Sequence, residues 1–189
     1  MNKIPTVYER DWEGDRSRVL SDVAPECEWV IAGEGVPTRK FDGTCVMFDG
    51  TSWWARREVK DGKPTPPGFV SSGHDHVTLK NVGWEPIGQS SFAKFHAEAV
   101  AHTEEWIPGT YELCGPKVQG NPEGFTAHVL IEHASADVVP VGHRDFPGIE
   151  DALRKNDIEG IVFWRDPNDP KCDKAKIKAK DFGIQRDSE

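Results

Sequence analysis

Residues 40–56 read KFDGTCVMFDGTSWWAR, and this stretch sets the fold that we expect for the chain. Thr44–Phe48 and Thr51–Arg56 are rich in β-branched and aromatic residues, and Asp49-Gly50 separates them. An Asp-Gly pair tolerates the positive φ angles of a tight two-residue turn. The stretch therefore predicts a β-hairpin that begins directly after the string Lys40-Phe41-Asp42-Gly43.

Strand signals dominate the rest of the chain. Further strands are expected at Cys27–Ala32, Thr110–Cys114, Thr126–His133, Gly160–Trp164 and Lys174–Lys180.

Apolar residues with helical spacing occur in two places, which predicts two helices. The two groups are Phe92, Phe95 and Ala99, capped by Ser90 or Ser91, and Ile149, Ala152 and Leu153, with Pro147 in the first turn. Many strands with few helices predict an α+β fold with mainly antiparallel sheets.

Length and composition bound the class of protein. The chain has 189 residues, 37% hydrophobic and 29% charged, which suits one globular domain spanning residues 1–189. There is no apolar run long enough for a membrane span and no signal-peptide pattern at the N-terminus, so we expect a cytoplasmic protein. The four cysteines are far apart and the histidines lack metal-ligand spacing, so reduced thiols are expected and a zinc site is not.

The charge distribution restricts nucleic-acid binding to a local surface. The formal net charge of −9 argues against a protein that binds nucleic acid over its whole surface. Two basic clusters could still form a groove: the group Arg56, Arg57, Lys60 and Lys63, and the five lysines within residues 171–180. The alternative for each cluster, and the more common case, is an ordinary solvated face.

Lys40 is the first candidate for chemistry, as a nucleophile. A free lysine has a pKa of about 10.4, so at neutral pH protonation costs it roughly 4–5 kcal/mol as a nucleophile. Desolvation or nearby positive charge must lower that pKa, and Arg39, the lysines at 174–180 or a bound metal are possible sources. Asp42 and Gly43 would form a turn that holds the lysine. The alternative is an ordinary surface turn.

Two glutamates and a lysine ladder follow Lys40. Glu112 and Glu159 lie in apolar strands, where a carboxylate is costly unless it is partnered by a ligand such as Mg²⁺ or Mn²⁺, or by a ribose hydroxyl. Alternating lysines at 174, 176, 178 and 180 share one face of a strand, where a triphosphate would relieve their repulsion. Solvent-facing edge strands are the alternative for all of these residues. The chain contains no Walker, Rossmann or Gly-x-Ser-x-Gly motif.

The ordered set resembles the covalent nucleotidyltransferase superfamily of ligases and messenger-RNA capping enzymes. Lys40-Phe41-Asp42-Gly43 looks like the nucleophile motif, Tyr111–Gly115 like the third motif, Glu159–Val162 like the fourth and Lys176-Ile177-Lys178 like the fifth. Lys178 and Lys180 are the alternative pair for the fifth. The match runs from residue 38 to about residue 182.

Within that superfamily the pattern is most similar to ATP-dependent RNA ligases. Cys45 stands where DNA ligases and capping enzymes usually carry an arginine, and the stretch from Gly109 to Pro122 looks closest to the small RNA ligase 1 family. Because few residues follow Lys180, we expect no C-terminal OB domain of the kind that the larger enzymes carry. The resemblance implies a bare adenylyltransferase domain with an ATP-grasp-like ligase fold.

The resemblance also implies a mechanism and a site. Lys40 would attack ATP to form lysyl-AMP, and the AMP would activate an RNA 5′-phosphate for joining to a 3′-hydroxyl, as in RNA repair. The implied nucleotide-binding residues are Arg39, Asp42, Gly43, Arg57, Glu112, Glu159, Lys176 and Lys178, with Glu112 and Glu159 also holding Mg²⁺ or Mn²⁺. Phe92, Phe95 or Trp84 would stack on adenine. The alternatives are a minimal DNA ligase, another covalent nucleotidyltransferase, or a non-catalytic RNA- or nucleotide-binding module.

Overall fold

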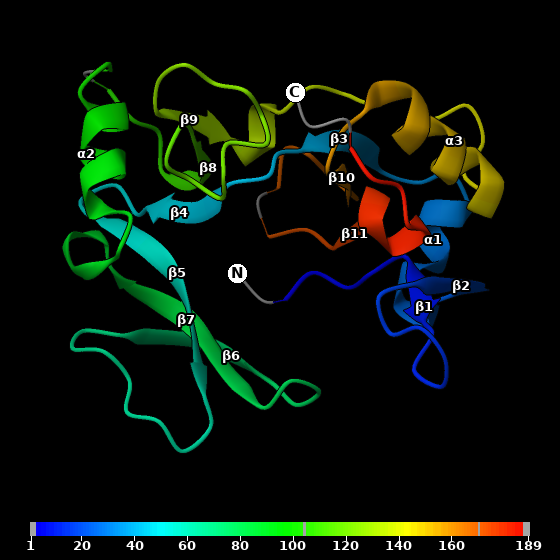
Figure 1. The fold of residues 1–189 in the computed structure, drawn as a ribbon, viewed down its shortest axis with the longest axis horizontal. Coiled ribbons are helices and arrows are strands. Elements are labelled where there is room, and N and C mark those ends of the chain that lie inside the picture. The colour runs from blue at the N-terminus through cyan, green and yellow to red at the C-terminus, as the bar shows by residue number, and fades with distance from the viewer. Residues whose placement is uncertain (1–2, 104, 170, 187–189) are drawn as a thin grey trace. The chain divides into compact units, whose positions relative to one another are not determined.

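A computed structural model describes residues 3–103, 105–169 and 171–186 (Figure 1). The fold is mixed α+β, with mostly antiparallel sheets and few helices, as the sequence predicts. The chain forms two compact units: unit 1 consists mainly of Asp42–Ser135, and unit 2 of Ile4–Phe41 together with the segment that begins at Ala136. None of the helices within the described residues is long and apolar enough to cross a membrane.

Unit 1 is built on one antiparallel sheet of six strands in the order β6-β7-β5-β4-β8-β9. The strands are β4 (Thr44–Phe48), β5 (Trp53–Lys60), β6 (Val70–Asp75), β7 (Lys80–Pro86), β8 (Gly109–Cys114) and β9 (Val129–Glu132). Helix α2 (Ala93–Val100) packs against β9. The short 3-10 turn η2 (Ile87–Gln89) precedes α2, and a second one, η3 (His133–Ser135), directly follows β9. Val46, Leu113 and Val118 are fully buried at the centre of its core.

The predicted hairpin is present as β4 and β5, but its turn lies one residue later than expected. Phe48 pairs with Trp53, and the Asp49 N–H donates to the Ser52 carbonyl, so Gly50 and Thr51 are the central residues. Gly50 has a φ of 100°. The Asp49 carboxylate explains the shift, because it accepts from the Thr51 and Ser52 amides and from the Trp54 indole.

Unit 2 contains a three-stranded antiparallel sheet in the order β11-β10-β3 and a small two-stranded sheet, β1-β2. The strands are β1 (Tyr8–Arg10), β2 (Val19–Val23), β3 (Val36–Lys40), β10 (Gly160–Trp164) and β11 (Lys174–Lys178). The helices are η1 (Pro25–Cys27), α1 (Glu28–Ile31), α3 (Phe146–Asn156) and η4 (Ala179–Phe182). The core buries one face of the sheet, with Ile161, Phe163 and Ile177 fully buried against Ile149 and Leu153 of α3.

Both predicted helices are confirmed. In α3 the Asp145 side chain accepts from the Gly148 amide, and the predicted stripe of Ile149, Ala152 and Leu153 is buried. In α2 the Ser90 hydroxyl accepts from the Phe92 amide, one residue before the helix begins.

The strand predicted at Cys27–Ala32 is wrong. Pro25 begins a 3-10 turn that continues into α1, and the Trp29 indole donates to the Glu26 carbonyl. A short apolar run fits strand and helix periodicity equally well, so spacing alone could not decide between them. The predicted strands at Thr126–His133 and Lys174–Lys180 are shorter than expected, because β9 begins at Val129 and β11 gives way to η4 after Lys178.

His96 introduces a pH dependence into the core of unit 1. Its ring is buried edge-on against Trp53, and burial lowers the pKa of His96 from 6.5 to about 4. The unfolded chain therefore takes up this proton at a higher pH than the folded chain, so stability falls as the pH drops from about 6.5 towards 4.

We expect the unfolding free energy to be about 2 kcal/mol lower at pH 5 than at pH 7.5 because of this residue. Denaturant titrations of the wild type and of His96→Phe should measure it, with the difference between the two pH values smaller in the variant. Equal pH dependence in both proteins would contradict the assignment.

Candidate active site

Three adjacent strands of unit 2 bring Lys40, Gly160 and Lys178 into one row. Gly160 on the central strand β10 pairs with Lys40 of β3 on one side and with Lys178 of β11 on the other. Residues directly opposite one another in a sheet project to the same face. The sheet register therefore places two lysines on one face with a glycine between them.

The carboxylate of Glu159, the residue before β10, holds both lysines. One oxygen (Oε2) lies 2.5 Å from Lys40 Nζ and the other (Oε1) lies 2.5 Å from Lys178 Nζ. The Glu159 carbonyl is fixed in turn by the Ala179 amide at 2.8 Å. A Cβ on Gly160 would lie only 2.4 Å from the Ile177 carbonyl oxygen, so the neighbouring strand requires glycine there.

Glu159 is ionised because of these contacts. Its side chain is 9% exposed and the lysine side chains are 21% and 23% exposed, so the three charges lie in partial shelter from solvent. Burial by itself would raise the pKa of Glu159, but the charges of Lys40 and Lys178 and their hydrogen bonds outweigh burial and lower it. Two ammonium groups around one carboxylate leave a net positive charge, which favours an anion.

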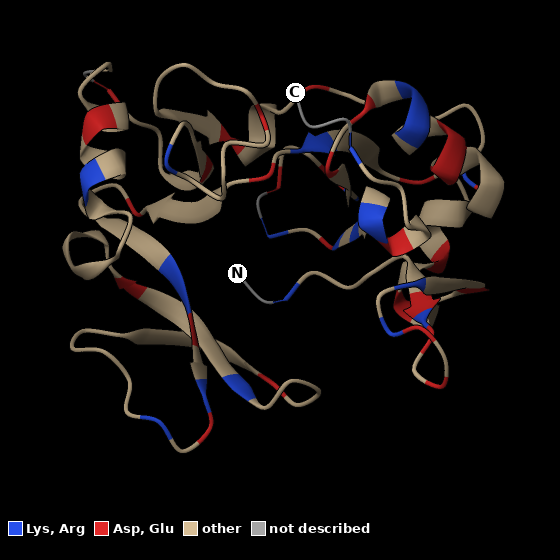
Figure 2. Cartoon of the chain, in the orientation of Figure 1, with Lys and Arg blue, Asp and Glu red and all other residues tan. Residues whose placement is uncertain are grey.

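The remaining lysines of β11 differ in their surroundings. Lys176 pairs with Val162 and shares the face of Lys178, whereas Ala175 and Ile177 are buried on the opposite face. Lys174 Nζ lies 4.2 Å from the Trp164 ring. Lys180 is exposed in η4, beyond the end of the strand. Lys174, Lys176 and Lys178 thus share one face of β11, and Lys180 lies beyond the end of the strand. Figure 2 shows the basic residues along β3 and β11.

Asp181 fixes the end of β11 from which Lys178 projects. Its buried carboxylate accepts from the Lys178 amide at 2.9 Å and from Arg10 at 3.0 Å. Arg39 contributes differently, because alternation along β3 turns it to the face opposite Lys40. Its guanidinium lies 4.5 Å from the centre of the Phe41 ring.

The other predicted residues belong to unit 1, where Glu112 of β8 is central. The Gly43 amide donates to Glu112 Oε1 at 3.1 Å, and the Asp42 amide donates to Glu123 Oε1 at 3.0 Å. A Cβ on Gly43 would lie 2.3 Å from the Leu113 carbonyl oxygen, so the loop after β3 can approach β8 this closely only with glycine. This explains the glycine of the Lys-x-Asp-Gly string in physical terms.

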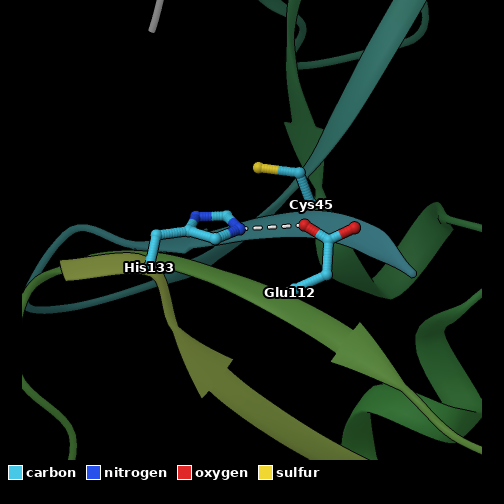
Figure 3. A group of neighbouring side chains, drawn as sticks. All are labelled: Cys45, Glu112 and His133. Atoms are coloured by element: carbon cyan, nitrogen blue, oxygen red, sulfur yellow. Dashed lines mark hydrogen bonds and ion pairs between the residues drawn. The ribbon is translucent and has the colours of Figure 1, made fainter. Parts of the chain in front are cut away.

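Glu112 also contacts a histidine that sequence reasoning missed. His133 Nε2 lies 2.9 Å from Glu112 Oε2, and Cys45, which pairs with Glu112 across β4 and β8, lies beside them (Figure 3). Glu112 is 7% exposed, and these polar contacts explain how a carboxylate is tolerated on a buried strand. No local spacing signals the cluster, because its members lie on separate elements.

Arg57 and the aromatic candidates have other surroundings. Arg57 is exposed on β5, with its Nε 4.0 Å from Glu85 of β7. Trp84 is 4% exposed beneath the Arg56 guanidinium, so its ring is already covered. Phe95 stacks on His128 with ring centroids 4.7 Å apart. Phe92 is partly buried against the core of unit 1.

The predicted site residues thus fall into two groups. Lys40, Glu159 and Lys178 are in direct contact within unit 2, with Lys176 on the same face. Gly43 and Glu112 are in contact within unit 1. Glu123 accepts a hydrogen bond from the Asp42 amide, and Asp181 accepts one from the Lys178 amide. Neither residue was predicted, because neither belongs to the short motifs whose backbone it holds.

Comparison with known protein families and with curated proteins found no match for this chain.

The shared carboxylate predicts a specific loss of stability. Glu159→Gln removes the charge that two partly buried lysines share, and we expect the unfolding free energy at pH 7 to fall by about 3 kcal/mol. The folded pKa of Glu159 is lowered, so its contribution is full above the unfolded value of about 4.5 and disappears as the pH falls through the folded pKa.

Denaturant titration at pH 7 and at pH 3 should show this difference shrinking in acid. Glu150→Gln, which removes one partner of a helical surface pair with Arg154, is the matched control and should cost at most about 0.5 kcal/mol. Equal stabilities of Glu159→Gln and the wild type at pH 7 would contradict the account.

Proposed function

We propose that this chain is an ATP-dependent RNA ligase that forms a lysyl-AMP intermediate on Lys40. The contact of Lys40 and Lys178 with Glu159 carries the proposal. It joins residues from three of the four motifs by which the sequence resembles covalent nucleotidyltransferases. A finer identity as a small ligase of the RNA ligase 1 type rests on that resemblance alone.

The first chemical step follows from the properties of an amine and a triphosphate. Lys40 loses a proton to solvent, and its neutral Nζ attacks the α-phosphorus of ATP. The N–P bond forms, the bond to the β-phosphate oxygen breaks, pyrophosphate leaves, and the nitrogen releases its second proton to solvent. A covalent intermediate of this kind divides one difficult transfer into two easier ones.

The charges around Glu159 suit this step. The resting group carries net positive charge, which attracts the triphosphate, and Lys176 and Lys178 are proposed to contact the α-phosphate and stabilise the charge that develops on it. The phosphoramidate nitrogen is no longer cationic, so Glu159 keeps Lys178 as its ion-pair partner after transfer. Glu159 therefore has the role of a positioning residue that holds Lys40 beside the lysine that binds phosphate.

The later steps follow the resemblance. The AMP passes from Lys40 to the 5′-phosphate of an RNA end, and the 3′-hydroxyl of a second end attacks that activated phosphate and releases AMP. Glu112 is proposed to bind the ribose, with Asp42 and Gly43 holding the loop. Arg57 is proposed to contact the nucleotide, whereas Arg39, which lies on the face of β3 opposite Lys40, has no part in the proposal.

Glu112 and Glu159 are the residues predicted to bind Mg²⁺ or Mn²⁺. The groups around both carboxylates fit these metals poorly. Each oxygen of Glu159 faces an ammonium group, and Glu112 lies beside sulfur and nitrogen donors. Hard cations prefer oxygen ligands. A divalent cation that arrives with ATP would neutralise phosphate charge.

Incubation with ATP labelled at the α-phosphate and Mg²⁺, followed by a denaturing gel, tests the proposal. We expect label on the wild-type protein and none on Lys40→Ala. Label that persists on Lys40→Ala, or no label on a folded wild type, would contradict it. Labelling of the protein by GTP instead of ATP would indicate capping chemistry. Comparing how fast the protein seals nicked RNA and nicked DNA distinguishes an RNA ligase from a minimal DNA ligase.

Lys178 gives a second and quantitative prediction. Lys178→Ala should slow adenylylation about 100-fold, because the α-phosphate loses a charged donor in the transition state. Lys180→Ala is the matched control, since Lys180 is exposed in η4, and should leave the rate within about twofold. The rates are measured in a single turnover, and equal rates for the two variants would exclude the proposed role of Lys178.

A further inference from the structure

Cys45, Glu112 and His133 form a compact group of metal-binding side chains in unit 1 (Figure 3). Cys45 comes from β4 and Glu112 from the opposite position of β8, while His133 begins η3, directly after β9. One sulfur, one carboxylate oxygen and one ring nitrogen all lie within 4.8 Å of one another. Such a spacing needs only a small adjustment to surround one ion.

The atoms on the outer side of the group already have partners that orient them. His133 Nδ1 lies 2.9 Å from the Thr110 hydroxyl, and Glu112 Oε1 accepts from the Gly43 amide at 3.1 Å. His133 Nε2 and Glu112 Oε2 instead face each other at 2.9 Å. Metal-binding histidines and carboxylates are held by outer hydrogen bonds in the same way, so the inner pair is positioned to bind a cation in place of its mutual contact.

We propose that Cys45 Sγ, Glu112 Oε2 and His133 Nε2 bind a zinc ion, with water as a fourth ligand. Thiolate, imidazole and carboxylate are the ligands that Zn²⁺ takes in tetrahedral sites, whereas Mg²⁺ does not favour sulfur or nitrogen. Cys45 releases its thiol proton to solvent when the ion binds. The thiolate and the carboxylate then balance the charge of the ion in this partly buried place.

Binding of zinc has a consequence for the proposed function. The ion occupies the carboxylate of Glu112, so Zn²⁺ should inhibit RNA ligation, at concentrations that fill the site, even when Mg²⁺ is in excess. This consequence rests on the proposed function, whereas metal binding does not. Measuring binding without ATP therefore keeps the two proposals separate.

Titration of the full chain with Co²⁺, a spectroscopic substitute for Zn²⁺, tests the site. We expect thiolate-to-cobalt charge-transfer absorption that saturates at one equivalent and disappears when Zn²⁺ is added. Cys45→Ser should abolish the band. Cys172→Ser, which alters another half-buried cysteine, should retain it. Thr110→Val should weaken binding about 10- to 100-fold, because it releases the outer nitrogen of His133.

Alkylation of the wild-type protein by iodoacetamide gives a test that needs no variant. Peptide mass spectrometry should show that Zn²⁺ slows alkylation of Cys45 at least tenfold and leaves Cys172 unaffected. The proposal is overturned if Co²⁺ gives no thiolate band, if the band survives in Cys45→Ser, or if Zn²⁺ protects both cysteines equally.

Discussion

The positions of Lys40 and Lys178 on the sheet of unit 2 depend on the carboxylate that Glu159 shares between them. Two ammonium groups on neighbouring strands would repel one another, and a single carboxylate between them turns that repulsion into attraction. The contact needs three strands in one register, a glycine at position 160 and a fixed end of β11 at Asp181. These features are the structural basis of the net positive charge that the proposed phosphate chemistry uses.

The two glutamates show how environment can separate the roles of similar side chains. Glu159 lies between two cations, whereas Glu112 lies beside a thiol and an imidazole, with an amide on its other oxygen. The first arrangement favours an anionic ligand that approaches the lysines. The second favours a soft cation. Two carboxylates that appear equivalent in sequence thus have opposite electrostatic surroundings.

Local patterns predicted those parts of the fold that depend on local chemistry. The Lys40 string, the Asp49-Gly50 region and the stripes of α2 and α3 are signalled by turn residues and spacing. The Cys27–Ala32 error shows where a short apolar run is ambiguous. Contacts across the sheet could not be predicted in the same way, because Glu159 reaches Lys40 over 119 positions and His133 reaches Glu112 over 21.

Lys40 is the residue that we propose to carry AMP. Mass spectrometry of peptides, prepared at neutral to alkaline pH after incubation with ATP, locates the modified residue directly. The account predicts one adenylyl group per chain, on Lys40, and its loss when pyrophosphate is added. An adenylyl group on any other residue, or an unmodified folded protein that still joins RNA ends, would contradict it.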